Sequence, residues 1–366
     1  MLADGCAMRI VNSVLGDSTG GRWQVVCDYS RVLSQHGHAV LMLLSENHRP
    51  DPGSIPAGVS VEYIRNRGHY DYLAAWSASR RFQDFAPHLA IAHCSRSVAL
   101  LKRATRRSVP VVAVTHSNKV KRLLQADAYL PLTSHIEQTL KQAGRVSLRK
   151  PCFVVPNMIA VEASPLTPVR QRHSPLRIGA LGRFDKVKGF DVFVEALGLL
   201  HARGVTFEAV LGGSGIERSR LRRQVRQLGL SERLSFPGWV TQVDRFLADV
   251  DILVVPARSD AFGLTPLQAA ASGIPLLLST ATGHGEMFED ETEALFCEIG
   301  DPHSTAQQLM RLMTDSELAE RLRQAAHRRT VRDYSTTKVS ERLLYTLENI
   351  SKYYEIHRAQ QIHRLN

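Results

Sequence analysis

The chain has 366 residues, of which 44% are hydrophobic and 22% are charged. This length and composition are typical of a globular protein with two domains of ordinary size, and they exclude a low-complexity chain. No apolar run reaches the roughly 18 residues of a membrane span, and no secretory signal is evident, so we expect a cytoplasmic protein. The five cysteines are scattered without a Cys-x-x-Cys pair, which suits free thiols and gives no metal site.

The sequence carries a formal net charge of +11. Such a charge indicates an acidic partner, which is nucleic acid, an anionic lipid or a phosphorylated small molecule. Basic residues cluster at 102–107, 119–122 and 218–226, and we expect these clusters mostly on solvated helix faces. No zinc-finger spacing, aromatic RNA-binding signature or recognition-helix pattern accompanies them, so nucleic acid is disfavoured.

Strands and helices alternate through the first half of the chain. The expected strands cover residues 10–15, 39–44, 59–64, 89–93, 111–115, 128–132 and 153–155, with helices at 23–36, 70–85 and 97–105. This alternation predicts a parallel, doubly wound α/β sheet. The pattern then stops in a stretch rich in Pro, Ser, Thr and Arg, which is the composition of an interdomain linker, at 161–175.

A second α/β series follows the linker. Its expected strands cover residues 177–181, 207–211, 234–236, 252–255, 276–279 and 295–299, with helices at 190–201 and 218–228. The remainder reads as helical, with a capping box from Thr314 to Glu317 and a last helix that begins at Thr336. We therefore expect two Rossmann-like domains, at 8–160 and 176–335, with a cleft between them and a C-terminal helix at 336–366 that packs back on the first.

One polar turn, at 259–270, organises the second series. It follows the apolar run 251–256, and a helix begins near Leu264. Gly263 lets the backbone approach a ligand, and the free N–H groups of the first helical turn suit a phosphate. Asp260 and Gln268 place a polar group on each side of the same pocket. From this segment alone, an ordinary helix start capped by Asp260 explains the pattern equally well.

Other strand ends of the second series carry glycines and cations. Gly182 and Arg183 follow the first strand, and Lys188 comes five residues after Arg183. Arg183 offers a phosphate a bidentate fork and Lys188 a mobile point charge. Gly213 lies in a glycine cluster that a plain tight turn explains as well. Trp239 and Val240 end a third strand, where they would form the wall beside a nucleobase, although an aromatic residue there is as often part of the core.

Taken together, these loops resemble those of the family 4 retaining glycosyltransferases of the GT-B fold, also called glycosyl transferases group 1. The resemblance runs over nearly all of residues 8–350 and is strongest at 176–300. Arg183 and Lys188 resemble the family's diphosphate-binding pair. The 260–268 segment is similar to its Glu-x7-Glu motif, with the central Phe-Gly-Leu preserved. In the first domain, the glycines at 20–21 resemble the loop that faces the donor phosphates, and His116 resembles a strand-end histidine near the reacting sugar.

Two residues depart from the family pattern. The first glutamate position is Asp260, which is one methylene shorter, and the second is Gln268, which is uncharged. The resemblance implies that the first carboxylate contacts the donor sugar and that the second holds the ribose diol. Asp still accepts a hydrogen bond from a sugar hydroxyl, and Gln from a ribose hydroxyl. We therefore expect donor binding with an altered preference.

The resemblance implies a glycosyltransferase that moves a sugar from a nucleotide-diphosphate sugar to a glycan or lipid-linked acceptor, with retention and without a divalent metal. The acceptor would enter from the first domain, in lipopolysaccharide or surface-polysaccharide synthesis at the inner face of the cytoplasmic membrane. The alternatives are a nucleotide-sugar epimerase of the same fold and a non-catalytic protein that binds a nucleotide or a polyanion. The expected catalytic residues are His116, Arg183, Lys188 and Asp260. The expected donor-binding residues are Gly20, Gly21, Gly182, Gly213, Trp239, Val240, Phe262, Gly263, Leu264, Thr265 and Gln268.

Aromatic and basic residues also alternate on the expected helix at 70–85. They are Tyr70, Tyr72, Trp76, Arg80 and Arg81. Such residues fit a membrane interface or an acceptor site. We favour the simpler expectation, in which the aromatic rings pack in the core and the basic edge is solvated.

Overall fold

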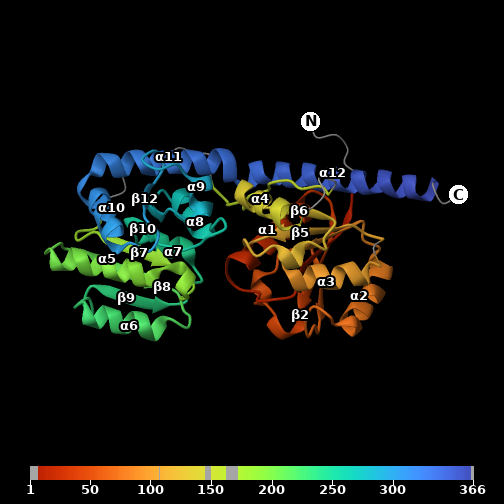
Figure 1. The fold of residues 1–366 in the computed structure, drawn as a ribbon, viewed down its shortest axis with the longest axis horizontal. Helices are drawn as coiled ribbons and strands as arrows, with labels where there is room; N and C mark the ends of the chain where they lie inside the picture. Colours follow the sequence, from red (N-terminus) through yellow and green to blue (C-terminus); the bar gives the residue numbers. More distant parts are fainter. Residues whose placement is uncertain (1–6, 107, 145–149, 162–171, 364–366) are drawn as a thin grey trace. The chain divides into compact units, whose positions relative to one another are not determined.

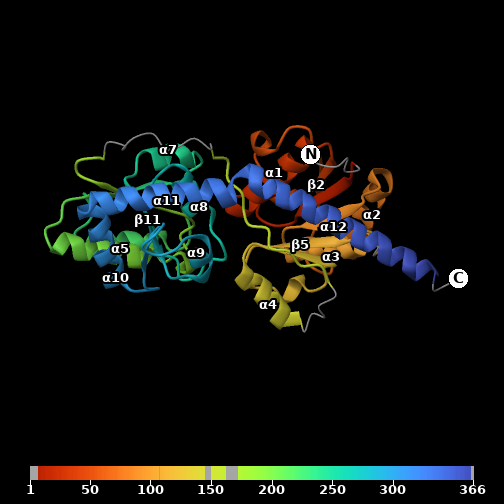
Figure 2. The same ribbon diagram turned by 90° about the horizontal axis from the view of Figure 1, so that it is seen from above.

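The computed structural model describes residues 7–106, 108–144, 150–161 and 172–363. The chain divides into two compact units. The first unit comprises Met1–Met158 and Thr337–Asn366, and the second comprises Ile159–Thr336. Each unit contains one parallel sheet with helices packed against it (Figures 1 and 2). Most of the expected linker, at 162–171, lies outside the described residues.

The sheet of the first unit has six parallel strands, built from buried apolar runs. These strands are β1 (Arg9–Val14), β2 (Ala39–Ser45), β3 (Ser60–Ile64), β4 (Leu89–Ala92), β5 (Val111–Thr115) and β6 (Ala128–Pro131). Their spatial order is β3-β2-β1-β4-β5-β6, which is the strand order of a Rossmann fold.

The sheet of the second unit repeats this arrangement. Its strands are β7 (Arg177–Leu181), β8 (Glu208–Gly212), β9 (Leu234–Gly238), β10 (Ile252–Val255), β11 (Leu276–Ser279) and β12 (Leu295–Cys297). Their order is β12-β11-β10-β7-β8-β9, and all pairs are parallel. The expected fold class, with two Rossmann-like sheets and C-terminal helices, is therefore confirmed.

Helices connect the strands in both units, close to the expected positions. In the first unit they are α1 (Gly20–Gln35), α2 (Tyr72–Phe85), α3 (Ser95–Ala104), α4 (Ser134–Gly144) and the C-terminal α12 (Thr336–His363). In the second unit they are α5 (Phe190–Ala202), α6 (Arg218–Gln227), α7 (Val243–Ala248), α8 (Leu264–Ala271), α9 (Thr282–Met287), α10 (Pro302–Thr314) and α11 (Ser316–Tyr334). Within the described ranges, no helix combines the length and apolar composition that a membrane span needs.

Two local expectations are wrong. Residues 153–155 do not form a strand, although Phe153 N–H donates to the Tyr129 carbonyl and Val155 N–H to the Pro131 carbonyl. Pro151 and Pro156 flank this segment and have no N–H to extend a ladder. The capping box at 314–317 is also wrong, because the Asp315 carboxylate caps α11 by accepting from Leu318 N–H at 2.9 Å.

A third expectation, core packing of the aromatic residues on α2, is wrong as well. Tyr70, Tyr72 and Trp76 are exposed. The buried face of α2 is instead formed by three alanines and Phe82, at Ala74, Ala75, Ala78 and Phe82. Because the helix has only one face toward the core, the aromatic rings on the other faces remain in solvent.

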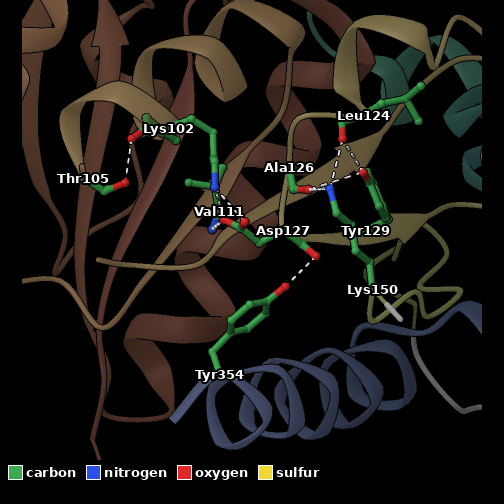
Figure 3. Close-up of polar contacts among 10 residues, drawn as sticks. Lys102, Thr105, Val111, Leu124, Ala126, Asp127, Tyr129, Lys150 and Tyr354 are labelled. Carbon is green, nitrogen blue, oxygen red and sulfur yellow. Dashed lines mark hydrogen bonds and ion pairs between the residues drawn. The ribbon is translucent and has the colours of Figure 1, made fainter. Parts of the chain in front are cut away.

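The C-terminal helix is fastened to the first unit by polar contacts around Asp127, the residue that precedes β6. The Tyr354 hydroxyl of α12 donates to the Asp127 carbonyl oxygen at 2.7 Å (Figure 3). The Asp127 carboxylate accepts from Lys102 Nζ at 2.6 Å and from Val111 N–H at 2.8 Å. One residue thus joins α3, β5 and α12.

Candidate functional site

The strand order of each sheet locates its ligand crevice. In doubly wound sheets, ligands bind beyond the carboxyl ends of the strands, at the point where the strand order reverses. In the second sheet this point lies between β7 and β10. The 182–189 segment follows β7, and the 256–263 segment follows β10. The loop that carries Arg183 and Lys188 therefore meets the loop that carries Asp260 at this point.

Glycines bring the loops after β7 and β8 into close contact. Gly182 has φ +156° and Gly213 has φ +139°. A Cβ atom at Gly213 would overlap the carbonyl oxygen of Gly182. The structure therefore gives these glycines a packing role between neighbouring loops, which the sequence left open for Gly213.

A short 3-10 turn over Lys186–Lys188 presents the cations after β7. The Asp185 carboxylate accepts from Lys188 N–H at 3.2 Å and from Arg183 Nε at 2.7 Å. Gly189 ends the turn in the left-handed conformation at φ +67°, where a Cβ atom would overlap the Pro256 carbonyl oxygen after β10. The backbone at Gly189 thus sets the separation of the two loops.

Lys188 and Asp260 form an ion pair across the reversal point. Lys188 Nζ donates to Asp260 Oδ2 at 2.7 Å. Burial by itself would raise the pKa of Asp260, but the nearby His284 imidazole and Lys188 ammonium outweigh it and hold that pKa well below its usual range. Asp260 is therefore a carboxylate, and its ion pair holds the Lys188 ammonium between the loops that follow β7 and β10.

His284, the third residue of α9, lies next to the Asp260 carboxylate of this pair. Its imidazole is fully buried, and Nδ1 lies 3.0 Å from the Ser279 carbonyl oxygen. Its Nε2 lies 3.9 Å from Asp260 Oδ2, which is too far for a hydrogen bond, and has no hydrogen-bond partner among the described residues. The sequence analysis did not assign His284, since no spacing rule links it to a residue 24 positions earlier.

Helix α8 begins beside Asp260. Gly263 is its N-cap, with φ +88°, and no side chain caps the first turn. Leu264, Thr265 and Gln268 are partly buried on the helix. The Phe262 side chain, in contrast, is buried against the Tyr334 ring, at 5.5 Å between ring centroids. Only the backbone of Phe262 is therefore available to a ligand, whereas the N-terminal N–H groups of α8 are free to receive an anion.

Trp239 and Val240 follow β9 at the same carboxyl edge of the second sheet. The Trp239 side chain is half exposed, and so it is not a core aromatic. The Val240 side chain packs next to Gly212, at 2.8 Å from the position that a Cβ atom of this glycine would take. Trp239 thus offers a free ring face at this edge.

The first sheet reverses its order between β1 and β4. Gly20 and Gly21 begin α1 beyond β1, and Gly20 adopts φ +67°. His116 follows β5 directly and is partly buried. Burial, aided by repulsion from Arg22, lowers the pKa of His116 to about 3, so the imidazole is neutral at physiological pH.

The partner of His116 was not predicted from the sequence. His93 directly follows β4, and its Nδ1 lies 3.0 Å from His116 Nε2, with the two rings stacked. Burial, followed by repulsion from His116 and Arg22, holds the pKa of His93 well below its usual range. His93 Nε2 is buried and has no hydrogen-bond partner among the described residues. Because a buried N–H without an acceptor is rarely tolerated, the His93 proton belongs on Nδ1 and is donated to His116. The His116 proton then sits on its own Nδ1.

Arg22 and Arg96 are further residues of this edge that sequence patterns did not reveal. Arg22 belongs to the first turn of α1 and Arg96 to the first turn of α3. A Cβ atom at Gly16 would lie 3.3 Å from Arg96 and 3.7 Å from Arg22, so both guanidinium groups reach the loop after β1. The described residues contain no cluster of three or more His, Cys, Asp or Glu side chains able to hold a metal ion.

The sequence is similar to known glycosyltransferases over part of its length. Residues 169–329 match the family model described as "Glycosyl transferases group 1". The lipopolysaccharide core biosynthesis glycosyltransferase LpsE of Rhizobium meliloti is 30% identical over 168 residues, which are 46% of this chain and 48% of that protein. The N-acetyl-alpha-D-glucosaminyl L-malate synthase of Bacillus anthracis is 27% identical over 43% of this chain and 42% of its own length. The matched region thus spans about half the length of these curated relatives.

Solved structures share the fold over almost the whole chain. HepE of Anabaena, solved with UDP-glucose, superposes with a TM-score of 0.78 at 16% identity and covers 93% of this chain and 100% of its own. The sucrose-phosphate synthase of Thermosynechococcus elongatus reaches a TM-score of 0.80 at 17% identity, over 96% of this chain and 100% of its own. At such low identity these matches establish the GT-B fold and nothing finer.

Proposed function

Because residues 169–329 belong to the glycosyl transferases group 1 family, we propose that this protein transfers a sugar from a nucleotide-diphosphate sugar to an acceptor hydroxyl. The bond between the anomeric carbon and the diphosphate oxygen breaks, and a bond to the acceptor oxygen forms as its proton leaves. The expected second domain, at 176–335, holds the donor, and the expected first domain, at 8–160, receives the acceptor. The segment at 336–366 completes the first unit.

The observation that carries the proposal is the Lys188–Asp260 pair beside the uncapped start of α8. Negative charge develops on the diphosphate as the sugar leaves, so the main catalytic task is to stabilise that charge. Arg183, whose side chain is 66% exposed, and Lys188 supply positive charge to the diphosphate. The N–H groups of Leu264 and Thr265 add hydrogen-bond donors, and the glycines at 182, 213 and 263 leave room for the anion.

Asp260 and Gln268 divide the remaining polar work. Asp260 is ionised and accepts hydrogen bonds from donor sugar hydroxyls, and Gln268 accepts from the ribose. Trp239 and Val240 flank the base. No residue of this set fixes the identity of the base, although UDP and UDP-glucose are ligands in structures with the same fold.

The first unit contributes His116, Gly20 and Gly21. A neutral His116 with its proton on Nδ1 donates one hydrogen bond to a sugar or phosphate oxygen. We propose a glycan or lipid-linked glycan as acceptor, because relatives include glycosyltransferases named for lipopolysaccharide core and O-antigen biosynthesis. Such an acceptor places the protein at the inner face of the cytoplasmic membrane, in peripheral contact with anionic lipid.

The experiment is incubation with a panel of nucleotide-diphosphate sugars, followed by mass spectrometry of the products. Slow release of nucleoside diphosphate and free sugar is expected for one donor, since water replaces a missing acceptor. Arg183→Ala should reduce this release by about tenfold or more, because a charge-assisted contact to a phosphate contributes about 1.5–3 kcal/mol.

The matched control is Arg203→Ala, an equally simple loss of an exposed arginine at the end of α5. It should release nucleoside diphosphate at the wild-type rate. Conversion of the donor into an epimeric nucleotide sugar would identify an epimerase instead. Release that is equally fast in the Arg183→Ala variant would refute the site assignment.

A further inference from the structure

Large apolar side chains gather in solvent at the start of α2. Among the described residues, eleven large hydrophobic side chains are exposed, and four of them fall within residues 70–76. These four are Tyr70, Tyr72, Leu73 and Trp76. Leu73 is 79% exposed and Trp76 57%. Such clustering on one short segment differs from the scattered exposed apolar residues of an ordinary surface.

The helix geometry gives these residues a common face. Leu73, Trp76 and Arg80 follow one another at spacings of three and four, so they lie along one stripe of α2. The opposite stripe carries Ala78 and Phe82 and is buried in the first unit. The apolar stripe therefore has no partner among the described residues of its own unit, and the core does not account for it.

Arginines are interleaved with the rings. The Arg80 guanidinium carbon lies 4.7 Å from the centroid of the Trp76 ring. The Arg103 guanidinium carbon lies 5.0 Å from the Tyr72 centroid and 5.6 Å from the Tyr70 centroid. Arg103 is held in place because it also donates to the His69 carbonyl oxygen at 2.6 Å. These contacts fix positive charges at the edge of the apolar stripe.

A basic groove continues from this stripe toward α12. Its volume is about 1260 Å³, and its described lining includes five Lys or Arg side chains and one carboxylate, Asp127. Asp127 is already bonded to Lys102, and Lys150 donates to the Leu124 and Ala126 carbonyl oxygens (Figure 3). The remaining cations are Arg103, Arg106 and Arg358. On α2 itself, Asp71 caps the helix and Asp84 lies near its end. Positive charge therefore dominates this groove.

We propose that this face, formed by residues 70–80 of the α2 region and the adjoining basic groove, binds the surface of an anionic lipid bilayer. Leu73 and Trp76 enter the boundary between headgroups and acyl chains, the tyrosines lie at headgroup level, and Arg80, Arg103 and Arg106 contact lipid phosphates. The proposal deepens the proposed function, on which it rests for the choice of a membrane-borne acceptor, by naming the surface that meets the membrane.

The apolar stripe distinguishes a bilayer from a soluble anion. A free phosphate would need the cations alone and would gain nothing from an exposed leucine. A bilayer buries Leu73 and Trp76 and at the same time offers lipid phosphates to the arginines. Each of these two contributions is small, so reversible binding needs both. The net charge of +11 favours the same anionic surface.

The test is co-sedimentation with vesicles of phosphatidylcholine, alone or mixed in equal parts with phosphatidylglycerol. The wild-type protein should bind the mixed vesicles, bind neutral vesicles at least tenfold more weakly, and lose affinity as salt is raised. The double variant Leu73→Glu/Trp76→Glu should lose at least tenfold in affinity for the mixed vesicles. Both side chains are exposed, so these changes leave the core intact, which circular dichroism checks.

Matched controls lie elsewhere on the chain. Tyr345→Glu introduces a negative charge at another exposed aromatic residue, on α12, and should bind like the wild type. Arg80→Gln/Arg106→Gln should weaken binding to mixed vesicles and flatten its salt dependence, whereas Arg223→Gln/Arg226→Gln on α6 should change neither. Wild-type protein that binds neither vesicle, or a Leu73→Glu/Trp76→Glu variant that binds as tightly as wild type, overturns the proposal. So does binding that soluble glycerol phosphate abolishes, since this would identify a free-phosphate site.

Donor hydrolysis without vesicles is measured on the same variants. We expect it to be unchanged in all of them, because none of these residues belongs to the proposed donor-binding set. Loss of vesicle binding with intact hydrolysis supports the surface. Vesicle binding that does not depend on this face, with intact hydrolysis, refutes the surface and leaves the proposed transferase activity standing.

Discussion

Asp260 illustrates at the residue scale how a buried carboxylate is kept ionised. Its pKa is lower in the folded chain than in the unfolded chain, since the His284 and Lys188 contacts outweigh the effect of burial. The ionised form therefore stabilises the fold at every pH above the ordinary carboxyl pKa of about 3.9. That stabilisation is lost as the pH falls below this value toward the depressed pKa.

The variant Asp260→Asn tests this linkage. It should lower the free energy of unfolding by about 1.5–3 kcal/mol at neutral pH, which is the range for loss of a hydrogen bond to a charged group. The difference from the wild type should shrink as the pH is lowered below about 4. Urea unfolding at a series of pH values measures it. A difference that stays constant down to strongly acidic pH would mean that Asp260 is not held as a carboxylate.

His93 is a positioning residue, since it acts on the proposed site through His116. Its Nδ1–H donates to His116 Nε2, which leaves the His116 proton on Nδ1. His93→Leu removes the donor and should shift the His116 proton to Nε2. His93→Asn keeps an N–H near the same position and should preserve the tautomer. The ¹⁵N chemical shifts of the His116 ring report this directly.

Activity should follow the tautomer in the same pair of variants. His93→Leu should slow donor turnover several-fold more than His93→Asn, although both remove the same imidazole. A wild-type spectrum with the His116 proton on Nε2 would rule out the hydrogen bond from His93 Nδ1–H to His116 Nε2. Equal activities of the two variants would reduce His93 to a packing role.

At the element scale, a close backbone approach at Gly189 joins the loops at 182–189 and 256–263, in addition to the Lys188–Asp260 ion pair. Gly189 and Gly204 have similar left-handed conformations, at φ +67° and +77°. A Cβ atom at Gly189 would overlap the Pro256 carbonyl oxygen, whereas a Cβ atom at Gly204 would meet nothing within 4 Å. Of these two glycines, Gly189 alone combines the conformational demand with a close approach between loops.

Substitution by alanine separates these two demands. Gly204→Ala should cost about 1 kcal/mol of unfolding free energy, which is the cost of a left-handed conformation for an L-residue. Gly189→Ala should cost about 1–3 kcal/mol more, because the 3-10 turn at Lys186–Lys188 has to move away from Pro256. It should also weaken donor binding through the displaced Lys188. Thermal unfolding of both variants measures this, and equal losses of stability would contradict the close approach.

The strands and helices could be predicted from the sequence because each depends on a local pattern. The runs at 177–181, 252–255 and 276–279 agree with β7, β10 and β11 residue by residue. Residues 153–155 have the same apolar pattern but form no strand, because the prolines on either side limit hydrogen bonding. Hydrophobic periodicity alone does not reveal this effect.

Side-chain contacts across the sheet were harder to predict. Lys188 and Asp260 are 72 residues apart, and only the strand order places them together. His93 and His116 pair for the same reason. The exposure of Trp76 was mispredicted because the buried face of α2 consists mostly of alanines. With such small residues in the core, the sequence does not show which face of the helix is buried.

At the scale of the whole molecule, we propose separate tasks for the two units. In this proposal the second binds the nucleotide diphosphate at the reversal point of its sheet, and the first contributes His116 together with a surface for the membrane. The central claim is that Lys188 belongs to a diphosphate site. Lys186 lies in the same 3-10 turn and provides a matched control, because its side chain is exposed and has no part in the proposed site.

Calorimetric titration of uridine, guanosine and adenosine diphosphates into the purified protein tests this claim most directly. We predict that at least one of them binds the wild type, that Lys186→Ala binds it equally well, and that Lys188→Ala binds it about tenfold or more weakly. Thermal unfolding without ligand verifies that the variants are folded. Binding by Lys188→Ala that is as tight as that of the wild type, or no binding of any of the three by the wild type, would contradict the account.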